Sequence, residues 1–209
     1  PLAGGGYVVV WTSRAQDGSN DGIYAQRYNA SGIPVGPEFR VNSSTSGYQV
    51  EGQVTGLSDG SFVVLWTDQS GLDGSSYGIY MQRYSALGVA LGGQQRVNAT
   101  TSSQQELPTV AAYDGGFVTA WASYSQDGSG WGIYAQRYAN DGSAVGAEFR
   151  VNSTTSGEQY EPEVAALADL WRTGYDTARI QGIPAYVVHG RFLIMTKSIK
   201  SPQGLADLV

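Results

Sequence analysis

Three short apolar runs, each ending in tryptophan, recur at even intervals along the first part of the chain. They occupy residues 7–11, 62–66 and 117–121 and read Tyr-Val-Val-Val-Trp, Phe-Val-Val-Leu-Trp and Phe-Val-Thr-Ala-Trp. Almost every position is apolar, which is typical of a strand that is covered on both faces of its sheet. We therefore predict three buried strands, one in each of three homologous repeats.

Each buried run is followed by a strand with a period of two and by a short final strand. The motif of the alternating strand starts at Gly22, Gly78 and Gly132. The motif of the short final strand starts at Arg40, Arg96 and Arg150. In the alternating strand, Ile23, Ala25 and Arg27 share one face. A further strand, such as residues 107–112, precedes each apolar run, and Asp-Gly or Ser-Gly turns lie between strands. The pattern predicts four strands in each repeat.

We expect an all-β fold in which residues 1–168 form three four-stranded blades of the propeller type, with a β-trefoil or a β-prism as the alternative. The 29 Gly and 14 Tyr suit Gly-rich turns between short aromatic strands. Propellers generally need about 4–8 blades to close, so three are too few. Either two chains form a homodimer that closes a six-bladed ring, or the chain is one arc of a longer parent, or the units make a true threefold fold.

The repeats begin out of phase, because residues 2–6 match the end of a first strand whose beginning is missing. A matching first strand follows the third repeat, at residues 161–167. We predict that residues 161–167 pair beside residues 5–11, in this molecule or a neighbour, and so leave few open edges. The opening at Pro1, inside a repeat, also suggests a mature or excised fragment.

The repeat pattern stops after Asp169, where the composition changes as well. Residues 1–168 contain no lysine and most of the acidic residues, whereas residues 169–209 hold both lysines and carry a net positive charge. We predict a boundary between a threefold β repeat domain, residues 1–168, and a short α/β C-terminal appendage, residues 169–209.

The motifs Asp-Gly-Gly-Phe-Val, Asp-Gly-Ser, Gly-Ile-Tyr-Ala-Gln-Arg-Tyr and Phe-Arg-Val-Asn recur, with small variations, in one order through residues 2–168. This pattern resembles the tandem repeats of large bacterial secreted proteins of the RTX and adhesin types. The resemblance implies propeller-like blades and an extracellular or cell-surface location, with the periplasm as the alternative.

Residues 180–194 read Ile-Gln-Gly-Ile-Pro-Ala-Tyr-Val-Val-His-Gly-Arg-Phe-Leu-Ile. The segment resembles the C-terminal part of a periplasmic thiol:disulfide oxidoreductase of the DsbA type, so residues 169–209 are expected to be a thioredoxin-fold-like fragment. The resemblance implies a cis-proline loop at Pro184, a hairpin turn at His189-Gly190 and a helix that begins at Ser201-Pro202. The chain has no cysteine, and disulfide exchange needs a thiolate, so redox activity is not carried over.

Charge and composition narrow the range of partners. The formal net charge of -6 argues against nucleic acid, since phosphate binding relies on clustered Lys and Arg. No apolar run reaches the ~20 residues that a membrane span requires. A glycan or a protein surface is therefore the expected partner, and no cofactor is expected, with calcium as the alternative.

Three residues differ at one position of the otherwise constant repeat: Asp21, Tyr77 and Trp131. Variable residues on a constant scaffold are where ligand contacts usually lie. Trp131 and Tyr77 are able to stack on a sugar, although exposed aromatic residues equally well cover a neighbouring turn. We predict that these three residues bind the ligand.

The Asp-Gly-Ser loops that begin at Asp17, Asp73 and Asp127 offer one carboxylate each. Calcium takes about 6–8 oxygen ligands from several groups, so one acid in each loop is a weak site. Ordinary turn chemistry is the favoured interpretation of the three aspartates, and a metal site is the alternative.

No catalytic group stands out in the repeats. Two arginines recur at the same places in each unit, which suits a structural role, stacked on Tyr or paired with Glu, better than a sialidase-like site; the six are Arg27, Arg40, Arg83, Arg96, Arg137 and Arg150. His189 is the single histidine and is expected in a turn, so no nucleophile with a His base is available in the repeats. Acidic residues are plentiful, but no pair for glycoside hydrolysis stands out.

We therefore expect a non-catalytic binding or scaffolding module of a bacterial secreted or cell-surface protein, binding carbohydrate or protein, and not an enzyme. A structural spacer, a fragment related to thiol:disulfide oxidoreductases and a glycosidase are the alternatives.

Overall fold

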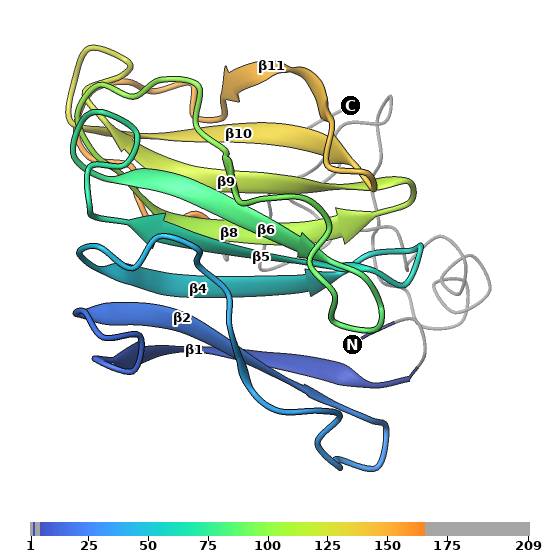
Figure 1. Ribbon diagram of the computed structural model, residues 1–209. Coiled ribbons are helices and arrows are strands. Elements are labelled where there is room, and N and C mark those ends of the chain that lie inside the picture. Colours follow the sequence, from blue (N-terminus) through green and yellow to red (C-terminus); the bar gives the residue numbers. More distant parts are fainter. Residues whose placement is uncertain (1, 3–4, 166–209) are drawn as a thin grey trace, which may run out of the picture. The chain divides into compact units, whose positions relative to one another are not determined.

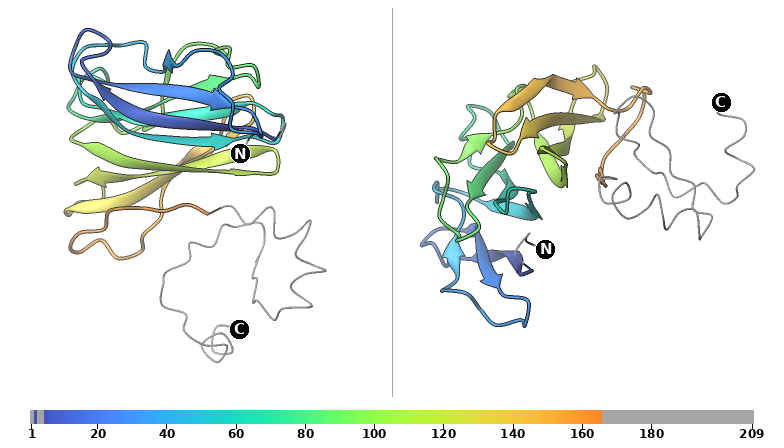
Figure 2. Two further views of the ribbon diagram at one scale, coloured as in Figure 1. Left: turned by 90° about the horizontal axis from the view of Figure 1, so that it is seen from below. Right: turned by 90° about the vertical axis from the view of Figure 1, so that its right-hand side faces the viewer.

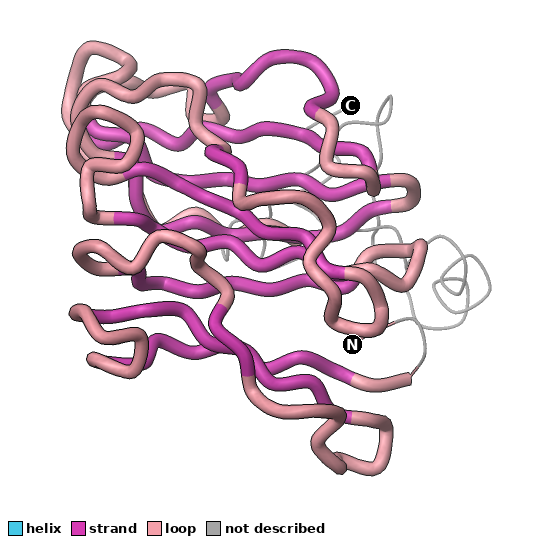
Figure 3. Tube along the Cα trace, viewed as in Figure 1, coloured by secondary structure: helices cyan, strands magenta, loops and turns pink. Residues whose placement is uncertain are grey.

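A computed structural model describes residues 2 and 5–165 of the 209-residue chain. Within this part every regular element is a β-strand (Figure 3), so the all-β prediction is confirmed there. No helix of these residues is long and apolar enough to cross a membrane. The chain divides into two compact units, Pro1–Val164 and Ala165–Val209, and the strands described below all belong to the first.

The strands form three antiparallel sheets, in each of which the chain passes from one strand to its neighbour. The first sheet contains β1 (Tyr7–Arg14), β2 (Asp21–Tyr28) and β3 (Phe39–Arg40). The second contains β4 (Gln49–Gly56), β5 (Phe62–Asp68), β6 (Gly78–Tyr84) and β7 (Gln95–Arg96). The third contains β8 (Gln105–Tyr113), β9 (Gly116–Tyr124), β10 (Trp131–Ala139) and β11 (Ala144–Arg150).

The three sheets follow one another around an arc within this unit, as the right-hand view of Figure 2 shows. The first strands of the second and third sheets, β4 and β8, contact each other, and β4 also contacts β1 (Figure 1). Strands β4 and β8 therefore lie on the concave side of the arc, and the short last strands lie on the convex side. This arrangement is propeller-like and favours the propeller-type prediction over the β-trefoil and β-prism alternatives.

Apolar side chains fill the space between successive sheets, and β5 shows why its sequence is apolar at almost every position. Successive side chains of a strand point to opposite faces of the sheet. Phe62 and Trp66 pack with residues of the first sheet such as Ile23, whereas Leu65 packs with residues of the third such as Trp121. Both faces of β5 are thus covered, as predicted for this run.

The equivalent strand of the first sheet, β1, is covered less well, so the prediction of a strand buried on both faces is wrong for residues 7–11. Val8 and Val10 pack against the core between the first and second sheets. Tyr7 and Val9 point to the other face and are 39% and 44% exposed. The reason is that β1 is at the end of the arc, where no further sheet of the described residues lies on that face.

A repeated side-chain contact joins the end of each sheet to the first strand of the next. Asn42 accepts a hydrogen bond from the Ile23 backbone N–H through Oδ1 (2.7 Å) and donates one through Nδ2 to Gln49 Oε1 (3.0 Å). The same Asn–Gln contact recurs at Asn98 and Gln105 (3.0 Å) and at Asn152 and Gln159 (3.1 Å). The first two contacts satisfy polar groups that would otherwise be buried without partners, and β4 and β8 begin at their glutamines; the third, Asn152–Gln159, is partly buried.

Two features of the predicted architecture are corrected by the structure. The first sheet has three strands instead of four, and residues 161–165 form no strand and do not pair beside residues 5–11 of the same chain; pairing with a neighbouring molecule stays a prediction. The Gln159 backbone N–H donates to the Trp131 carbonyl (2.9 Å), just as the Gln105 N–H donates to the Tyr77 carbonyl (3.1 Å) where β8 begins, so this segment starts beside the third sheet. Residues 166–167 and the predicted appendage, with Pro184, the His189-Gly190 turn and the Ser201-Pro202 helix start, lie outside the described residues.

Candidate functional site

The first strands of the second and third sheets are both irregular near their beginning. Strand β4 shifts register between Val50 and Gln53, and β8 shifts between Glu106 and Thr109. Inside these irregularities Glu51 and Leu107, at equivalent positions, have positive φ angles of 60° and 56°. Such bulges redirect side chains and are frequent beside active sites, so the groups that they present on the concave side are candidates for function.

Glu51 is held at this place by donors from two different sheets. Its Oε2 accepts a hydrogen bond from Thr67 Oγ1 on β5 (2.6 Å) and one from the Leu107 backbone N–H on β8 (2.8 Å). An ionised carboxylate is only an acceptor, and both partners of Glu51 are donors. The carboxylate therefore bridges the second and third sheets through their inner strands, and neither recorded hydrogen bond uses its Oε1.

Glu106 lies next to this carboxylate, because it directly precedes the residue whose N–H binds Glu51. Burial raises the pKa of the Glu106 carboxyl, and the negative charge of Glu51 raises this pKa further. The repeat places Val50 and Tyr160 at the positions equivalent to Glu106, one residue after the glutamine of the Asn–Gln contact. Glu106 thus breaks the symmetry of the repeat, which a catalytic group has to do.

The two glutamates have the properties of an acid–base pair. Glycoside hydrolysis commonly uses two carboxyl groups, one protonated and one ionised, and neighbouring environments that push their pKa values apart mark such pairs. Sequence reasoning missed the pair because the bulges bring Glu51 and Glu106 together from different repeats. The signal that was present is the replacement of Val50 and Tyr160 by Glu106 at one repeat position.

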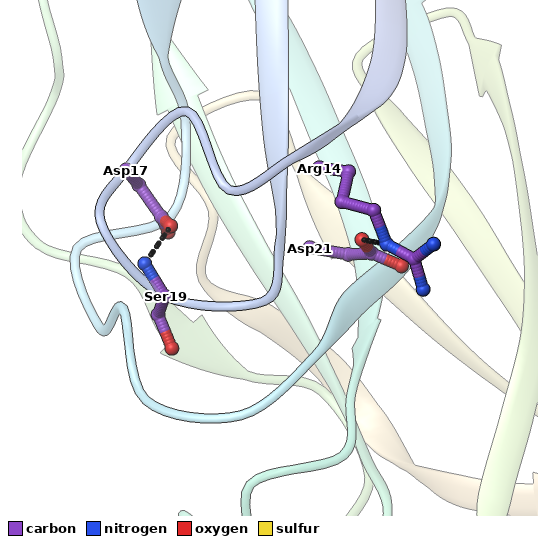
Figure 4. Close-up of polar contacts among 4 residues, drawn as sticks. All are labelled: Arg14, Asp17, Ser19 and Asp21. Carbon is purple, nitrogen blue, oxygen red and sulfur yellow. Dashed lines mark hydrogen bonds and ion pairs between the residues drawn. The ribbon is translucent and has the colours of Figure 1, made fainter.

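The predicted ligand-binding residues occupy equivalent positions in three different sheets. Asp21 begins β2 and forms an ion pair with Arg14 (3.6 Å between Oδ1 and Nε; Figure 4). Trp131 begins β10 and makes an edge contact with Tyr124, and Tyr77 accepts a hydrogen bond from the Gln105 N–H through its carbonyl (3.1 Å).

The structure does not gather these three residues into one site. No hydrogen bond, ion pair or ring contact recorded for Asp21, Tyr77 and Trp131 joins any two of them. Asp21 and Trp131 are instead the first residues of β2 and β10, and Tyr77 directly precedes β6. A role in ligand binding stays a prediction for all three.

The predicted metal candidates support turns. The Oδ1 atoms of Asp17 and Asp73 accept hydrogen bonds from the Ser19 and Ser75 N–H groups (3.0 Å each), as Figure 4 shows for the first loop. Their Oδ2 atoms are buried, have no hydrogen-bond partner and lie against glycine, where an added Cβ would be 2.8 Å (Gly22) and 2.9 Å (Gly78) away. Asp127 makes the same turn contact, with the Ser129 N–H (3.2 Å).

In each sheet, burial and then the negative charge of one of these aspartates raise the pKa of a nearby tyrosine. In the second sheet, burial, followed by the charges of Asp73 and Asp68, raises the pKa of Tyr80 to about 12. No group of three or more His, Cys, Asp or Glu side chains within residues 2 and 5–165 is arranged to hold a metal ion. Calcium at Asp17, Asp73 or Asp127 therefore stays an untested alternative.

The repeated arginines join successive sheets. Arg27 Nη1 donates to the Leu87 carbonyl (2.6 Å), and Arg83 Nη1 donates to the Asp141 carbonyl (2.6 Å). Leu87 lies in the segment between β6 and β7 and Asp141 in the turn between β10 and β11, so Arg27 and Arg83 each join their sheet to a turn of the following repeat, which is a structural role. Their partners are backbone carbonyls instead of the expected tyrosine or glutamate.

Comparison with known proteins gives two separate likenesses. No protein-family model matches the chain. The chain is 55% identical over 49 residues to the "Thiol:disulfide interchange protein DsbL" of Escherichia coli O6:H1, a match that covers 23% of this chain and 22% of that relative. The same values hold for the protein of that name from Klebsiella pneumoniae. The predicted resemblance of part of the chain to thiol:disulfide oxidoreductases is thus confirmed, and the chain spans about a fifth of those relatives. The resemblance to RTX and adhesin repeats stays a prediction.

Solved structures share the fold. A protein of unknown function from Dyadobacter fermentans has a TM-score of 0.53 and 14% identity, with 76% of this chain and 42% of that chain covered. A thermostable family-43 glycoside hydrolase has a TM-score of 0.49 and 12% identity, with 79% and 59% covered. An endo-arabinase from Bacteroides thetaiotaomicron has a TM-score of 0.43 and 20% identity, with 71% and 59% covered. At these identities the likeness concerns the fold alone.

The prediction of a non-catalytic module, and with it the prediction that the chain is not an enzyme, is corrected. The two structures named above as a glycoside hydrolase and an endo-arabinase share the fold alone, and the chain spans 59% of each. The structure also places Glu51 beside Glu106, a carboxyl pair that the sequence did not reveal. The glycosidase alternative therefore fits better than the binding or scaffolding module.

Proposed function

We propose that this chain is part of a glycoside hydrolase in which Glu106 and Glu51 are the two catalytic carboxyl groups. The observation that carries the proposal is geometric: Glu106 directly precedes Leu107, whose N–H holds the Glu51 carboxylate together with Thr67 Oγ1, so two carboxyl groups meet at the bulged inner strands. Burial and then the charge of Glu51 raise the pKa of Glu106, which supports this assignment. Because the raised pKa keeps Glu106 protonated to higher pH, it is the general acid. Glu51, fixed by Thr67 and Leu107, is the ionised partner.

The reaction uses the two groups in sequence. Glu106 gives its proton to the glycosidic oxygen as the bond to the anomeric carbon breaks. Glu51 supplies the negative charge that supports the positive anomeric centre. A water molecule then bonds to that carbon through its oxygen and gives up a proton to a carboxylate of the pair, so that the products are a free reducing sugar and the released alcohol. General acid catalysis of this kind typically contributes about 10²–10⁴-fold to the rate.

Other parts of the proposal concern recognition and location. Trp131 and Tyr77 are proposed to stack on sugar rings, and Asp21 to contact the same polymer at the equivalent place in the first sheet. An extracellular or periplasmic location suits a polysaccharide substrate and the resemblance to secreted repeat proteins. The chain spans only part of every relative and neighbour described, so the activity is proposed for the larger assembly that its sheets belong to.

Hydrolysis of polysaccharides tests this function. The full chain is incubated with arabinan, xylan and a panel of other glycans, and new reducing ends are measured for the wild type, Glu106→Gln, Glu51→Gln and the control Glu38→Gln. Glu38 is an exposed residue outside the inner strands. We expect hydrolysis by the wild type and the control, and a loss of about 10²-fold or more in both inner-strand variants. Absence of hydrolysis across the panel, or equal rates for the wild type and Glu106→Gln, would overturn the proposal.

A further inference from the structure

The second sheet buries an aspartate that the other two sheets lack. Asp68, the last residue of β5, is 1% exposed and lies opposite Gly78. At the equivalent position the first sheet carries Ser13 and the third carries Ser123. A buried ionised side chain is costly unless it is paired with an opposite charge or coordinates a metal. Asp68 therefore requires a partner that the two serines do not require.

The loop that follows β5 brings a second carboxylate to the same face of the sheet. Residues directly opposite each other in antiparallel strands point to one face, with Cβ atoms about 4.5–5.5 Å apart. A Cβ added to Gly78 would therefore lie beside the Asp68 side chain, and it would be 2.9 Å from Asp73 Oδ2. The Asp73 carboxylate thus takes the space of the missing Gly78 side chain, next to Asp68.

The two aspartates lie in the middle one of the three sheets. Trp66 is on the same face as Asp68, because it stands two residues earlier in β5, and it packs with Ile23 of the first sheet. The other face of β5 packs against the third sheet. The surroundings of Asp68 and Asp73 are therefore set by the described sheets on both sides.

One oxygen of each carboxylate has a partner and the other has none. Oδ1 of Asp68 accepts a hydrogen bond from the Ser70 N–H (2.9 Å), and Oδ1 of Asp73 accepts one from the Ser75 N–H (3.0 Å). The Oδ2 atoms of both aspartates are buried, and neither has a hydrogen-bond partner. Two buried acceptors on one face of the second sheet thus lack a donor in the described part of the chain.

No basic side chain balances the two negative charges. Among residues 2 and 5–165, neither Asp68 nor Asp73 forms an ion pair with Lys, Arg or His. Burial, followed by the charges of Asp73 and Asp68, raises the pKa of Tyr80 to about 12, and Arg96 opposite Tyr80 offsets this only in part. The two carboxylates therefore act on one small region, and a bound positive ion would balance them.

The equivalent loops of the other sheets hold one carboxylate each. In the third sheet Asp127 Oδ2 accepts a hydrogen bond from Asn152 Nδ2 (3.5 Å). In the first sheet Asp17 Oδ2 is buried without a partner and lies against Gly22, but the residue opposite Gly22 is Ser13 instead of a second acid. Of the three described sheets, the second alone combines two carboxylates at this position.

We infer that the second sheet binds one calcium ion between the Oδ2 atoms of Asp68 and Asp73. The charge of a divalent cation equals that of the two carboxylates. Calcium accepts about 6–8 oxygen ligands in flexible geometry, whereas magnesium demands a near-ideal octahedron. No group of three or more His, Cys, Asp or Glu side chains in the described residues is arranged around a metal, so loop carbonyls and water complete the coordination. The ion fastens the loop at residues 69–77 to the end of β5, a role that goes beyond the proposed hydrolysis.

Calorimetric titration tests the site. The full chain is freed of metal with a chelator and titrated with CaCl2 or MgCl2, as the wild type, Asp68→Asn, Asp73→Asn and the matched control Asp17→Asn. Each variant removes one charge but keeps the Oδ1 acceptor of its turn. We expect one calcium ion to bind with a dissociation constant of about 10⁻⁴ M in the wild type and the control, and at least about tenfold more weakly in Asp68→Asn and Asp73→Asn. Magnesium should bind the wild type more weakly than calcium.

Melting curves provide a second readout with a change of sign. Without calcium, Asp68→Asn and Asp73→Asn should melt above the wild type, because one of two neighbouring like charges is removed. With calcium the wild type should melt above both variants, because the ion binds only its folded state. A wild-type melting temperature that calcium leaves unchanged would overturn the inference. So would unchanged affinity in both Asp68→Asn and Asp73→Asn, or an equal loss in Asp17→Asn. No glycan takes part in either measurement, so their failure is distinct from failure of the proposed function.

Discussion

The first and second sheets have nearly the same sequence motifs but very different environments. Trp66 of β5 is 0% exposed and every residue of that strand is buried, whereas exposure alternates along β1 and its Trp11 is only partly buried. The difference comes from position, because β5 has a sheet on each face and β1 has one. A sequence motif in a repeat protein therefore states what a strand is able to bury, and its neighbours decide what it does bury.

The largest expected effect on stability comes from replacing the tryptophans at equivalent positions of β1 and β5. Trp66→Ala should lower the free energy of unfolding by about 3–5 kcal/mol, because a large side chain is removed from a fully packed core. Trp11→Ala should cost clearly less, because part of that side chain already contacts solvent. Denaturant unfolding of both variants, at a dilution where light scattering gives the mass of one chain, measures the contrast. Equal losses would show that β1 is covered in the single chain.

The next effect concerns the Asn–Gln contacts. Gln105→Ala should cost about 1–3 kcal/mol, because it removes one of the two acceptors of the buried Asn98 Nδ2 group, which keeps only the Thr100 carbonyl. Gln159→Ala should cost less, because Gln159 is only partly buried. Denaturant unfolding under the same dilute conditions gives both values. The account of the contact as the start of each first strand fails if Gln105→Ala leaves stability unchanged.

A smaller effect is expected for the arginines that join the sheets. Arg83→Ala should lose about 0.5–1.5 kcal/mol, the net contribution of an ordinary hydrogen bond, because its Nη1 bonds the Asp141 carbonyl. Arg137, at the same position of the third sheet, has no such carbonyl partner among the described residues, so Arg137→Ala should lie close to zero. Thermal unfolding compares the two. A larger loss for Arg137→Ala would contradict the structural role assigned to Arg83.

The smallest effect is a pH dependence of stability. It is expected at Glu106 of the third sheet, where the second sheet has Val50 at the same repeat position. Because the folded state raises the pKa of Glu106 above 4.5, the carboxyl contributes stability below that pH and loses it as pH rises through the raised pKa. Glu106→Gln cannot ionise, so its melting temperature should exceed that of the wild type near about pH 7 and match it at acid pH. Melting curves across this pH range show whether the variant or the wild type has the higher melting temperature near neutral pH. The wild type would melt higher if a positive charge stabilised the ionised form of Glu106.

The repeat pattern was sufficient to predict much of the fold. The run at residues 62–66, the alternating strand from Gly78 and the short strand at Arg96 each lie on a strand of the second sheet. These elements follow from local periodicity and turn residues, which the sequence displays directly. The closing strand was wrong for residues 161–165 within one chain, because pairing depends on which edge is within reach, and no local pattern encodes that. Pairing with a neighbouring molecule stays a prediction.

The candidate site was harder to predict for a related physical reason. Glu51 and Glu106 belong to different repeats and become neighbours only because two bulged strands meet on the concave side of the arc. Residues chosen for their variability, such as Trp131 and Tyr77, were instead distributed one to a sheet. A search for breaks in repeat symmetry on the inner strands would have found Glu106.

The central claim is that Glu51 and Glu106 interact so that one of them keeps its proton to a higher pH. A carbon-detected NMR titration of the Glu106 carboxyl, in the wild type and in Glu51→Gln, tests this claim directly. We predict a midpoint above 4.5 in the wild type and a lower midpoint in Glu51→Gln, because one of the two causes of the shift is removed. A wild-type midpoint at or below 4.5, or one that Glu51→Gln leaves unchanged, would contradict the account.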